Sequence, residues 1–324
     1  ARRYRFIWVA NLDLQFAITK KMKKVKNLTK NKIIVIAGPT AVGKTALSIN
    51  IAQKYDGEII NGDSQQVYRE VHIGTAKATA GEQAAVSHHL IDVRDLSESF
   101  SAHDFVTQAN VAIADISSRG KLPIIVGGTG LYLQSLIEGY HLGGSGHHEE
   151  MRALRQKLDL LTDDQLFAKV FDHQIEMPEM NRRRAIRALE IAKFGGELAN
   201  QKSDYDFLII GLNTERSVLY ERINHRVDLM MTAGLLEEAT MLYARFREAQ
   251  VSRAIGYKEF FPYFEGQITL EAAVEAVKQN SRRYSKRQIT WFKNRMGVDF
   301  QDILAPDFQD QVDQKIERFL DDKN

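Results

Sequence analysis

Residues 33–45 read IIVIAGPTAVGKT, and this stretch decides the fold. Its first five residues, Ile33–Ala37, form a continuous apolar run, which is typical of a central parallel strand covered on both faces. The next eight, Gly38–Thr45, match G-x-x-x-x-G-K-[ST] at every fixed position. An amphipathic stretch, Ala46–Tyr55, follows the motif. Strand, glycine loop and helix in this order predict a phosphate-binding loop, or P-loop.

Each residue type in this loop has a physical reason. Glycine leaves room for backbone N–H groups to turn inward, and these donors form a concave anion site with the helix N-terminus. Lys44 adds a mobile positive charge, and the Thr45 hydroxyl is placed to hold Mg²⁺. We therefore expect a diphosphate or triphosphate to contact Gly38, Pro39, Thr40, Ala41, Val42, Gly43, Lys44 and Thr45.

Further short apolar runs predict the rest of a sheet: Glu58–Asn61, Leu90–Val93, Leu122–Val126 and Phe207–Leu212. Amphipathic stretches such as Ala102–Ser117 separate most of them. Strands that alternate with helices favour a parallel sheet with right-handed crossovers. We expect an α/β fold with a P-loop NTPase-like parallel sheet core, a helical insertion domain and a helical C-terminal part.

The insertion is predicted because the alternation breaks after Gly139. A glycine-rich hinge, 143–146, precedes helical segments that have no strand between them. Thr162 and Gln165 form a capping box for one helix, and Asn181 can cap another, Arg182–Phe194. We expect residues 147–204 to form a helical insert. Residues 31–146 and 205–324 then form the core with C-terminal helices.

Composition narrows the chemistry. The chain has no cysteine, which excludes disulfides, thiolate zinc sites and cysteine nucleophiles. A net charge of +2 gives no global affinity for polyanions, so any nucleic-acid surface must be local. No apolar run is long enough to span a bilayer. We expect residues 1–30 to be a disordered or non-native N-terminal extension, with Met22 as the natural start.

An acidic residue stands at an unusual place for a P-loop protein. A nucleotide hydrolase normally carries a carboxylate after a second strand, but the run Leu122–Val126 is followed by the glycine-rich turn Gly127–Tyr132. Asp63 instead follows the strand Glu58–Asn61, and α/β sheets bind ligands at the carboxyl ends of their strands. Asp63 has two possible roles: it caps a helix or a turn, or it faces the bound phosphates. We favour the second role because the chain also carries the P-loop and the glycine-rich turn.

Two basic clusters predict a phosphate-backbone track. One lies on a short helix and comprises Arg182, Arg183, Arg184 and Arg187. The other, in residues 278–295, has Lys278, Arg282 and Lys286 at four-residue spacing, with Tyr284 and Trp291 on the opposite, core side. A single such helix is usually a solvated face, but two of them in a nearly neutral chain favour RNA binding.

The motifs together closely resemble the bacterial tRNA dimethylallyltransferase family, also called tRNA isopentenyltransferase or IPP transferase. The resemblance covers residues from about 31 to about 300 and rests on Gly38–Thr45, Asp63–Tyr68, Ile73–Lys77, Gly127–Tyr132, Arg184–Glu190, Ala254–Lys258 and Lys286–Trp291. It implies transfer of the dimethylallyl group of dimethylallyl diphosphate to N6 of adenosine 37, in tRNAs reading codons that begin with U. It also implies Mg²⁺ as the cofactor and a helical insert, residues 147–204, that binds the anticodon stem-loop. We expect a monomer in the cytoplasm with no membrane partner.

The resemblance gives the candidate residues their roles. Asp63 would take up the amine proton or orient the amine, while Lys44 and Thr129 would stabilise the leaving diphosphate, with Arg253 as a further cation. The tRNA-binding set is Asp63, Ser64, Gln65, Gln66, Thr129, Arg152, Asn181, Arg182, Arg183, Arg184, Ala185, Arg187, Arg282 and Lys286. Thr45 is the expected metal ligand.

Three other functions stay open on the sequence. A small-molecule kinase would use ATP on the same loop. A close variant of the transferase would prenylate free AMP or ADP. A non-catalytic RNA-binding protein would use a nucleotide as a switch and form no covalent product.

Overall fold

The computed structural model describes residues 32–140, 148–177, 180–194 and 203–322. The chain divides into two units, one ending at Leu133 and resuming at Asp204, the other running over Gln134–Ser203. The predicted N-terminal extension, residues 1–30, lies outside the described residues.

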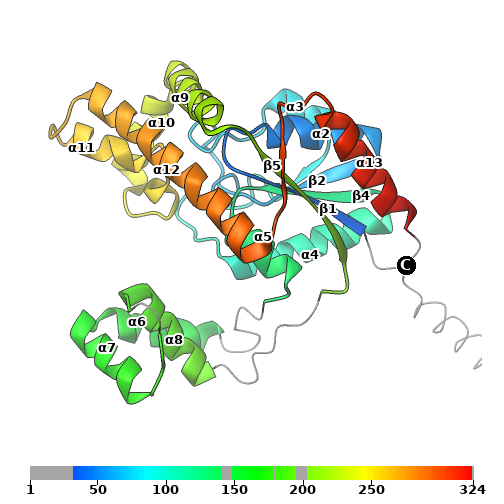
Figure 1. Ribbon diagram of the computed structural model, residues 1–324. Coiled ribbons are helices and arrows are strands. Elements are labelled where there is room, and N and C mark those ends of the chain that lie inside the picture. Colours follow the sequence, from blue (N-terminus) through cyan, green and yellow to red (C-terminus); the bar gives the residue numbers. More distant parts are fainter. Residues whose placement is uncertain (1–31, 141–147, 178–179, 195–202, 323–324) are drawn as a thin grey trace, which may run out of the picture. The chain divides into compact units, whose positions relative to one another are not determined.

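A parallel sheet forms the centre of the first unit (Figure 1). In the described part of the chain it has six strands in the order β3-β2-β4-β1-β5-β6, and every neighbouring pair is parallel. The strands are β1 (Lys32–Ala37), β2 (Gly57–Asn61), β3 (His88–His89), β4 (Leu122–Gly127), β5 (Asp206–Asn213) and β6 (Phe300–Asp302). The predicted α/β class and parallel sheet are confirmed.

Helices cover both faces of this sheet (Figure 1). On one face, α2 (Lys44–Lys54) and α13 (Phe308–Asp321) bury apolar side chains against the strands, with Ile51, Ile316 and the strand residue Ile34 in one cluster. On the other face lies α4 (Ala102–Ser118), which buries its own apolar stripe. Because successive strand residues point to opposite faces, the unbroken apolar run of β1 is needed to meet both layers.

The first unit contains several further helices. They are α3 (Ala80–Ala85), α5 (Gly130–Ile137, which continues into the second unit), α9 (Arg216–Thr232), α10 (Leu235–Phe246), α11 (Phe261–Phe264), α12 (Leu270–Met296) and the 3₁₀ turns η1 (Val251–Arg253) and η2 (Lys258–Phe260). Thr269 caps the long α12, and Gly297, with a φ of 61°, ends it. Among the described residues, no helix is both long and apolar enough to cross a membrane.

One predicted strand was wrong. The run Leu90–Val93 is not a strand, because Leu90 and Asp92 have φ values of 62° and 56°, which an extended chain does not allow. The strand instead lies just before it, at His88–His89, and pairs with β2. The short β6, which the sequence pattern did not predict, adds to β5 at the other edge.

The second unit contains α6 (His148–Asp159), α7 (Asp163–Asp172) and α8 (Arg182–Phe194). Leu158, Leu166 and Leu189 belong to their shared core, and Glu190 accepts two hydrogen bonds from Arg155, at 2.7 and 2.9 Å. The capping box of Thr162 and Gln165 is confirmed, and Asn181 Oδ1 accepts from the Arg184 amide at 3.0 Å. The predicted insert, residues 147–204, covers these three helices.

Candidate active site

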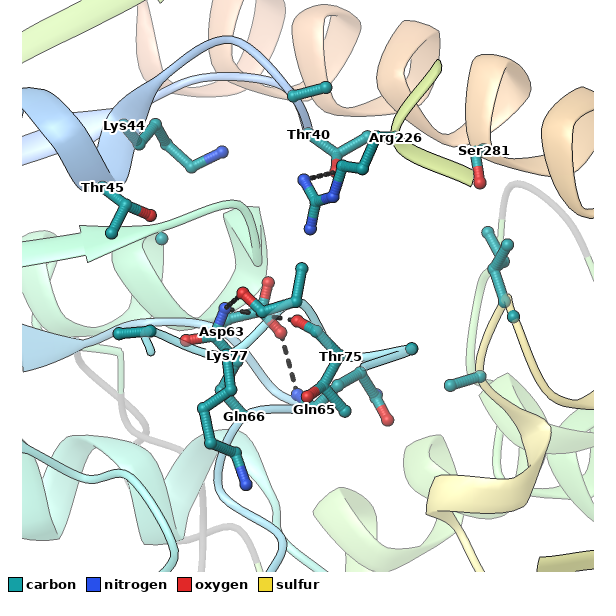
Figure 2. A pocket seen from close by; sticks show the side chains of 18 of the residues that line it. Thr40, Lys44, Thr45, Asp63, Gln65, Gln66, Thr75, Lys77, Arg226 and Ser281 are labelled. Atoms are coloured by element: carbon teal, nitrogen blue, oxygen red, sulfur yellow. Dashed lines mark hydrogen bonds between the residues drawn. The ribbon is translucent and has the colours of Figure 1, made fainter. Parts of the chain in front are cut away.

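Three loops meet at the carboxyl edge of the sheet. They follow β1, β4 and β2, which are neighbours in the sheet, and they carry the P-loop, the glycine-rich turn and Asp63. A pocket of about 680 Å³ opens there. In Figure 2, Lys44, Thr45, Thr40 and Arg226 lie along one side of it, and Asp63, Gln65 and Gln66 lie across from them.

The P-loop conformation depends on its two fixed glycines. Gly43 has a φ of 100°, in the left-handed region, and α2 begins directly after it. At Gly38, a Cβ would lie 2.6 Å from the Leu212 carbonyl oxygen, so the close approach to β5 needs glycine. The Lys44 ammonium donates to the carbonyl oxygens of Gly38 and Pro39, at 3.0 and 2.7 Å. The loop is therefore held in place by the side chain that the motif reserves for phosphate.

Lys44 is poised to gain from an anion. Burial lowers the pKa of its ammonium to about 8; the Asp63 carboxylate acts to raise it, and Arg226 lowers it further. A diphosphate in the pocket would favour the charged form of this lysine. The charged Lys44 is thus unfavourable in the empty pocket, and a bound diphosphate or triphosphate would stabilise it.

Arg226 brings a second cation to the same side of the pocket. It lies in α9 and donates from Nη1 to Thr40 Oγ1 at 3.1 Å (Figure 2). Burial lowers the pKa of its guanidinium, and the Asp63 carboxylate opposes that change. Sequence inspection missed this residue. A usable signal existed, because Arg226 interrupts the buried stripe of α9 between Ile223 and Val227, where an unpaired charge is rare.

The Asp63 loop is organised by its neighbours. The Asn61 side chain accepts from the Asp63 amide at 3.0 Å and donates to the Leu90 carbonyl at 3.0 Å. Asp63 Oδ1 accepts from the Gln65 amide at 2.9 Å, and Thr129 Oγ1 accepts from the Ser64 amide at 3.0 Å. The carboxylate is therefore fixed by its own loop and by the glycine-rich turn, while it lines the pocket.

The two glutamines after Ser64 form the floor of the pocket in the view of Figure 2. Gln66 Nε2 donates to the carbonyl oxygens of Thr75 and Ala76, at 3.3 and 3.2 Å. Gln65 Nε2 donates to Ser64 Oγ at 3.1 Å, while its buried Oε1 has no hydrogen-bond partner among the described residues. A buried amide oxygen of this kind is suited to accept from a ligand.

A carboxylate outside the P-loop holds the opposite wall. Glu238, in α10, accepts hydrogen bonds from three successive amides, His72, Ile73 and Gly74, at 2.7, 3.1 and 2.9 Å. The Tyr257 hydroxyl donates to the same carboxylate at 2.6 Å. Gly74 belongs to this arrangement because a Cβ would lie 2.6 Å from the Tyr257 ring. This contact fixes the segment that continues into the pocket wall at Thr75–Ala78.

Comparison with known proteins identifies the family. The family model described as IPP transferase matches residues 66–295. A curated tRNA dimethylallyltransferase of Lactococcus lactis subsp. lactis is 61% identical over 290 residues, which cover 90% of this chain and 99% of the relative. The chain belongs to the IPP transferase family.

Solved structures of IPP transferases share this fold. The full-length tRNA isopentenylpyrophosphate transferase of Bacillus halodurans is 44% identical, with a TM-score of 0.69 over 90% of this chain and 98% of that one. A eukaryotic dimethylallyltransferase captured while acting on tRNA is 31% identical, with a TM-score of 0.73 over 88% of this chain and 78% of that one.

Most of the expected diphosphate-binding residues, and several of the expected tRNA-binding residues, gather at the pocket. Its lining includes Thr40, Ala41, Gly43, Lys44, Thr45, Asp63, Ser64, Gln65, Gln66 and Arg253. Gly38, Pro39, Val42 and Thr129 are not among the lining residues. Arg253 is a peripheral cation, because its side chain is 72% exposed and lies 3.7 Å from Glu248. The backbone N–H of Thr40 was expected to bind phosphate, but it donates to Gln288 Oε1 at 2.9 Å.

The expected RNA-contacting residues of this IPP transferase divide into several groups. Ala185 needs a correction: it is fully buried in the core of the second unit, so its side chain has no surface to offer. Arg182 donates to Asp163 Oδ1 and to the carbonyl oxygens of Asp159 and Leu161, all within 2.8 Å, and so joins the helices of its own unit. Arg183 and Arg184 are exposed, and Arg187 pairs with Glu190 at 3.2 Å. The side chain of Arg152 lies outside the described residues.

The predicted basic stripe on α12 is only partly a charged surface. Arg282 donates to Asn224 at 2.6 Å and to Glu275 at 2.9 Å, and Lys278 pairs with Asp228 at 2.6 Å. The contacts to Asn224 and Asp228 join α12 to α9, and Glu275 is a neighbour on α12 itself, whereas Lys286 is exposed. Tyr284 was expected in the core but lines the pocket.

Proposed function

We propose that this protein is a tRNA dimethylallyltransferase. It would transfer the dimethylallyl group of dimethylallyl diphosphate to N6 of adenosine 37, in tRNAs that read codons beginning with U, and release diphosphate. The observation that carries this proposal is the shared pocket, in which the P-loop after β1 and a carboxylate in the loop after β2 face each other. Membership of the IPP transferase family supports it.

The P-loop side would stabilise the leaving group. As the bond from the allylic carbon to oxygen breaks, negative charge builds on the diphosphate. The amides of residues 41–45, Lys44 and Arg226 present fixed positive charge and N–H donors to that group. Such preorganised donors act on the charge that develops in the transition state, so they accelerate transfer rather than only binding substrate.

Asp63 would act on the nucleophile. The N6 amine of adenosine is weak because its lone pair is delocalised into the ring. A carboxylate that accepts one of its hydrogens orients the lone pair toward the allylic carbon and takes up the proton as the new bond forms. The loop contacts to Asn61 and Gln65 hold Asp63 in place for this step.

Adenosine must leave its stack to reach a diphosphate in this pocket. Such extrusion costs a few kcal/mol by order of magnitude. We propose that Ser64, Gln65 and Gln66 offset part of this cost by hydrogen bonds to the extruded base. The buried Gln65 Oε1 supports this role, because it can accept from a base N–H.

We propose that the RNA backbone is held mainly outside the pocket. The helical insert, residues 147–204, would bind the anticodon stem-loop, with Arg183, Arg184 and Arg187 on α8 as phosphate contacts, and with Arg152 and Asn181 beside them. Lys286 would extend the contact on the core. Arg182 and Arg282 would act indirectly, by bracing helices. Because its substrate is tRNA, we propose that the enzyme works in the cytoplasm, as a monomer.

Mg²⁺ fits the residues present. This ion needs only one or two protein oxygens when substrate phosphates supply the others. Thr45 lines the pocket at the first turn of α2, next to Lys44. The part of the chain that the structure describes has no three-residue cluster of metal-ligating side chains, so the Thr45 hydroxyl would be its main protein ligand. When bound, the ion would neutralise charge on the leaving diphosphate.

The main alternative is a small-molecule kinase that uses ATP. It lacks support from β4, which ends in glycines where a kinase-like Mg²⁺ site needs a carboxylate. The deciding experiment incubates the protein with labelled dimethylallyl diphosphate and total tRNA, followed by nucleoside analysis. We expect label on N6 of adenosine 37. ATP turnover without any prenylated nucleoside would overturn the proposal, and label on free AMP would move the acceptor from RNA to nucleotide.

A further inference from the structure

One buried side chain connects the P-loop to the glycine-rich turn. Gln288, in α12, accepts at Oε1 from the Thr40 amide and donates from Nε2 to the Gly128 carbonyl, both at 2.9 Å. The side chain is 5% exposed. We refer to this pair of hydrogen bonds as the Gln288 bridge.

Each end of the Gln288 bridge leads to a chemical group. Thr40 belongs to the P-loop, and its hydroxyl accepts from Arg226. Gly128 precedes Thr129, whose hydroxyl accepts from the Ser64 amide, next to Asp63. A short series of hydrogen bonds therefore runs from the cation at the leaving group, through Gln288, to the carboxylate loop.

The glycine-rich turn is shaped around α12. A Cβ on Gly128 would lie 2.2 Å from Gln288 Nε2, and one on Gly130 would lie 2.3 Å from Trp291 Cδ1. Tyr284 interacts with Thr129 and Gln288, and burial raises the pKa of its phenol. Tyr284, Gln288 and Trp291 are spaced along one face of the helix. The glycines of this turn thus admit the side chains of α12 at close range.

The residue type at 288 is restrictive. The Gln288 bridge needs one acceptor and one donor on a single rigid group at a fixed spacing. Glutamate would keep the acceptor for Thr40 but could not donate to Gly128, and methionine would fill similar volume without either bond. Only an amide of this length satisfies both loops.

We propose that Gln288 is a positioning residue, which fixes the P-loop and the Asp63 loop at the separation that prenyl transfer requires. Gln288 makes its two bonds to protein atoms, so it acts through the groups it holds. The inference rests on the proposed function, because it assigns the two loops to the leaving group and the nucleophile. A small misplacement of reacting groups can cost about a hundredfold in rate.

The test compares Gln288→Met with a matched control, Ser285→Ala. Ser285 is fully buried on the same helix, and its hydroxyl donates within that helix, to Arg282 O. For Gln288→Met we expect kcat to fall roughly 10- to 100-fold while Kd for dimethylallyl diphosphate changes less than about threefold. Gln288→Glu should lose kcat and also bind the diphosphate more weakly, because it adds negative charge. Ser285→Ala should keep kcat.

Hydrogen exchange gives a readout that does not depend on activity. Gln288→Met should speed amide exchange in both the P-loop and the glycine-rich turn, whereas Ser285→Ala should speed neither. A kcat for Gln288→Met within twofold of wild type would overturn the inference. The inference would also be overturned if Gln288→Met lowered only the melting temperature and the fraction of active enzyme, while the active molecules kept the wild-type kcat. If wild type forms no prenylated nucleoside, the proposed function fails. The Gln288 bridge is tested separately by hydrogen exchange: amide exchange in Gln288→Met that equals wild type at either loop would refute it.

Discussion

Arg226 donates a hydrogen bond to the hydroxyl of Thr40 at 3.1 Å, although 186 positions separate the two residues. This contact places a cation from α9 over the P-loop, where Lys44 already supplies one. Burial lowers the pKa of Lys44, and repulsion from the Arg226 guanidinium lowers it further. The free enzyme is therefore strained electrostatically in a way that a diphosphate would relieve.

Asp63→Asn should separate transfer from binding. Asparagine keeps an oxygen for the Gln65 amide but cannot take up a proton from the amine. We expect kcat to fall by roughly 10²- to 10⁴-fold, with little change in affinity for dimethylallyl diphosphate. Single-turnover kinetics and diphosphate titration measure the two effects. An equal loss of both would assign Asp63 to folding.

The Lys44 pKa of about 8 predicts a pH effect on stability. Between pH 8 and the ordinary value of 10.5, the unfolded chain keeps a proton that the folded chain has released. Stability rises with pH wherever the unfolded state binds more protons. The free energy of unfolding of wild type, relative to Lys44→Met, should therefore increase across this window. Urea denaturation at several pH values tests this, and a constant difference would contradict the shift.

Thr45→Ala should raise the Mg²⁺ concentration needed for half-maximal activity. The variant removes a hydroxyl at the first turn of α2, while Thr45→Ser keeps it and serves as the control. Metal titrations at saturating diphosphate measure the requirement. An unchanged titration for the alanine variant would remove Thr45 as a ligand.

Arg183→Ala with Arg187→Ala should weaken tRNA binding and flatten its salt dependence. Each phosphate contact that is lost should reduce the slope of log affinity against log salt by about one. Filter binding at several salt concentrations measures that slope. Arg182→Ala is the contrast, because its guanidinium holds α6 and α7 together; it should lower thermal stability more than the slope. An unaltered slope for the double variant would argue against phosphate contact on α8.

Glu58 predicts an acid-sensitive part of the stability. Its carboxylate is buried and pairs with Arg119, with additional contacts from His89 and Lys121, and these hold its pKa at about 2. A depressed carboxylate pKa stabilises the fold above the unfolded value of 4.5, and this stabilisation is lost as pH falls toward 2.

Glu58→Gln should therefore lower the free energy of unfolding near neutral pH by roughly 1–3 kcal/mol, the range for hydrogen bonds to charged groups, because its cationic partners are partly exposed to solvent. The difference from wild type should shrink as pH falls from 4.5 to 2. Asp115→Asn, which removes an exposed partner of Arg119, should change little. Chemical denaturation across this pH range measures both, and a gap that persists at pH 2 would contradict the assignment.

Local signals explain what the sequence predicted well. The P-loop, the capping box of Thr162 and the Asn181 cap depend on residues within a few positions of each other, so their patterns determine their structure. The continuous apolar run of β1 likewise identifies a strand buried on both faces. These features supplied the fold class and half of the candidate site.

Distant contacts explain what the sequence did not predict. Gln288 meets Thr40 across 248 positions, and Glu238 meets His72 across 166. No spacing rule connects such pairs, and the polar residues involved resemble any surface glutamine or glutamate. The strand error has a different cause: Leu90–Val93 is apolar enough for a strand, but the backbone at Leu90 and Asp92 turns into the left-handed region.

The contact between Glu238 and the amides of residues 72–74 has a consequence for how a substrate would enter. Three successive N–H groups that converge on one point make the kind of hollow in which proteins capture phosphate. Here the Glu238 carboxylate already accepts from these N–H groups, and Gly74, one of the three residues, lines the pocket. A diphosphate that enters the pocket would therefore bind at the P-loop rather than at the amides of residues 72–74.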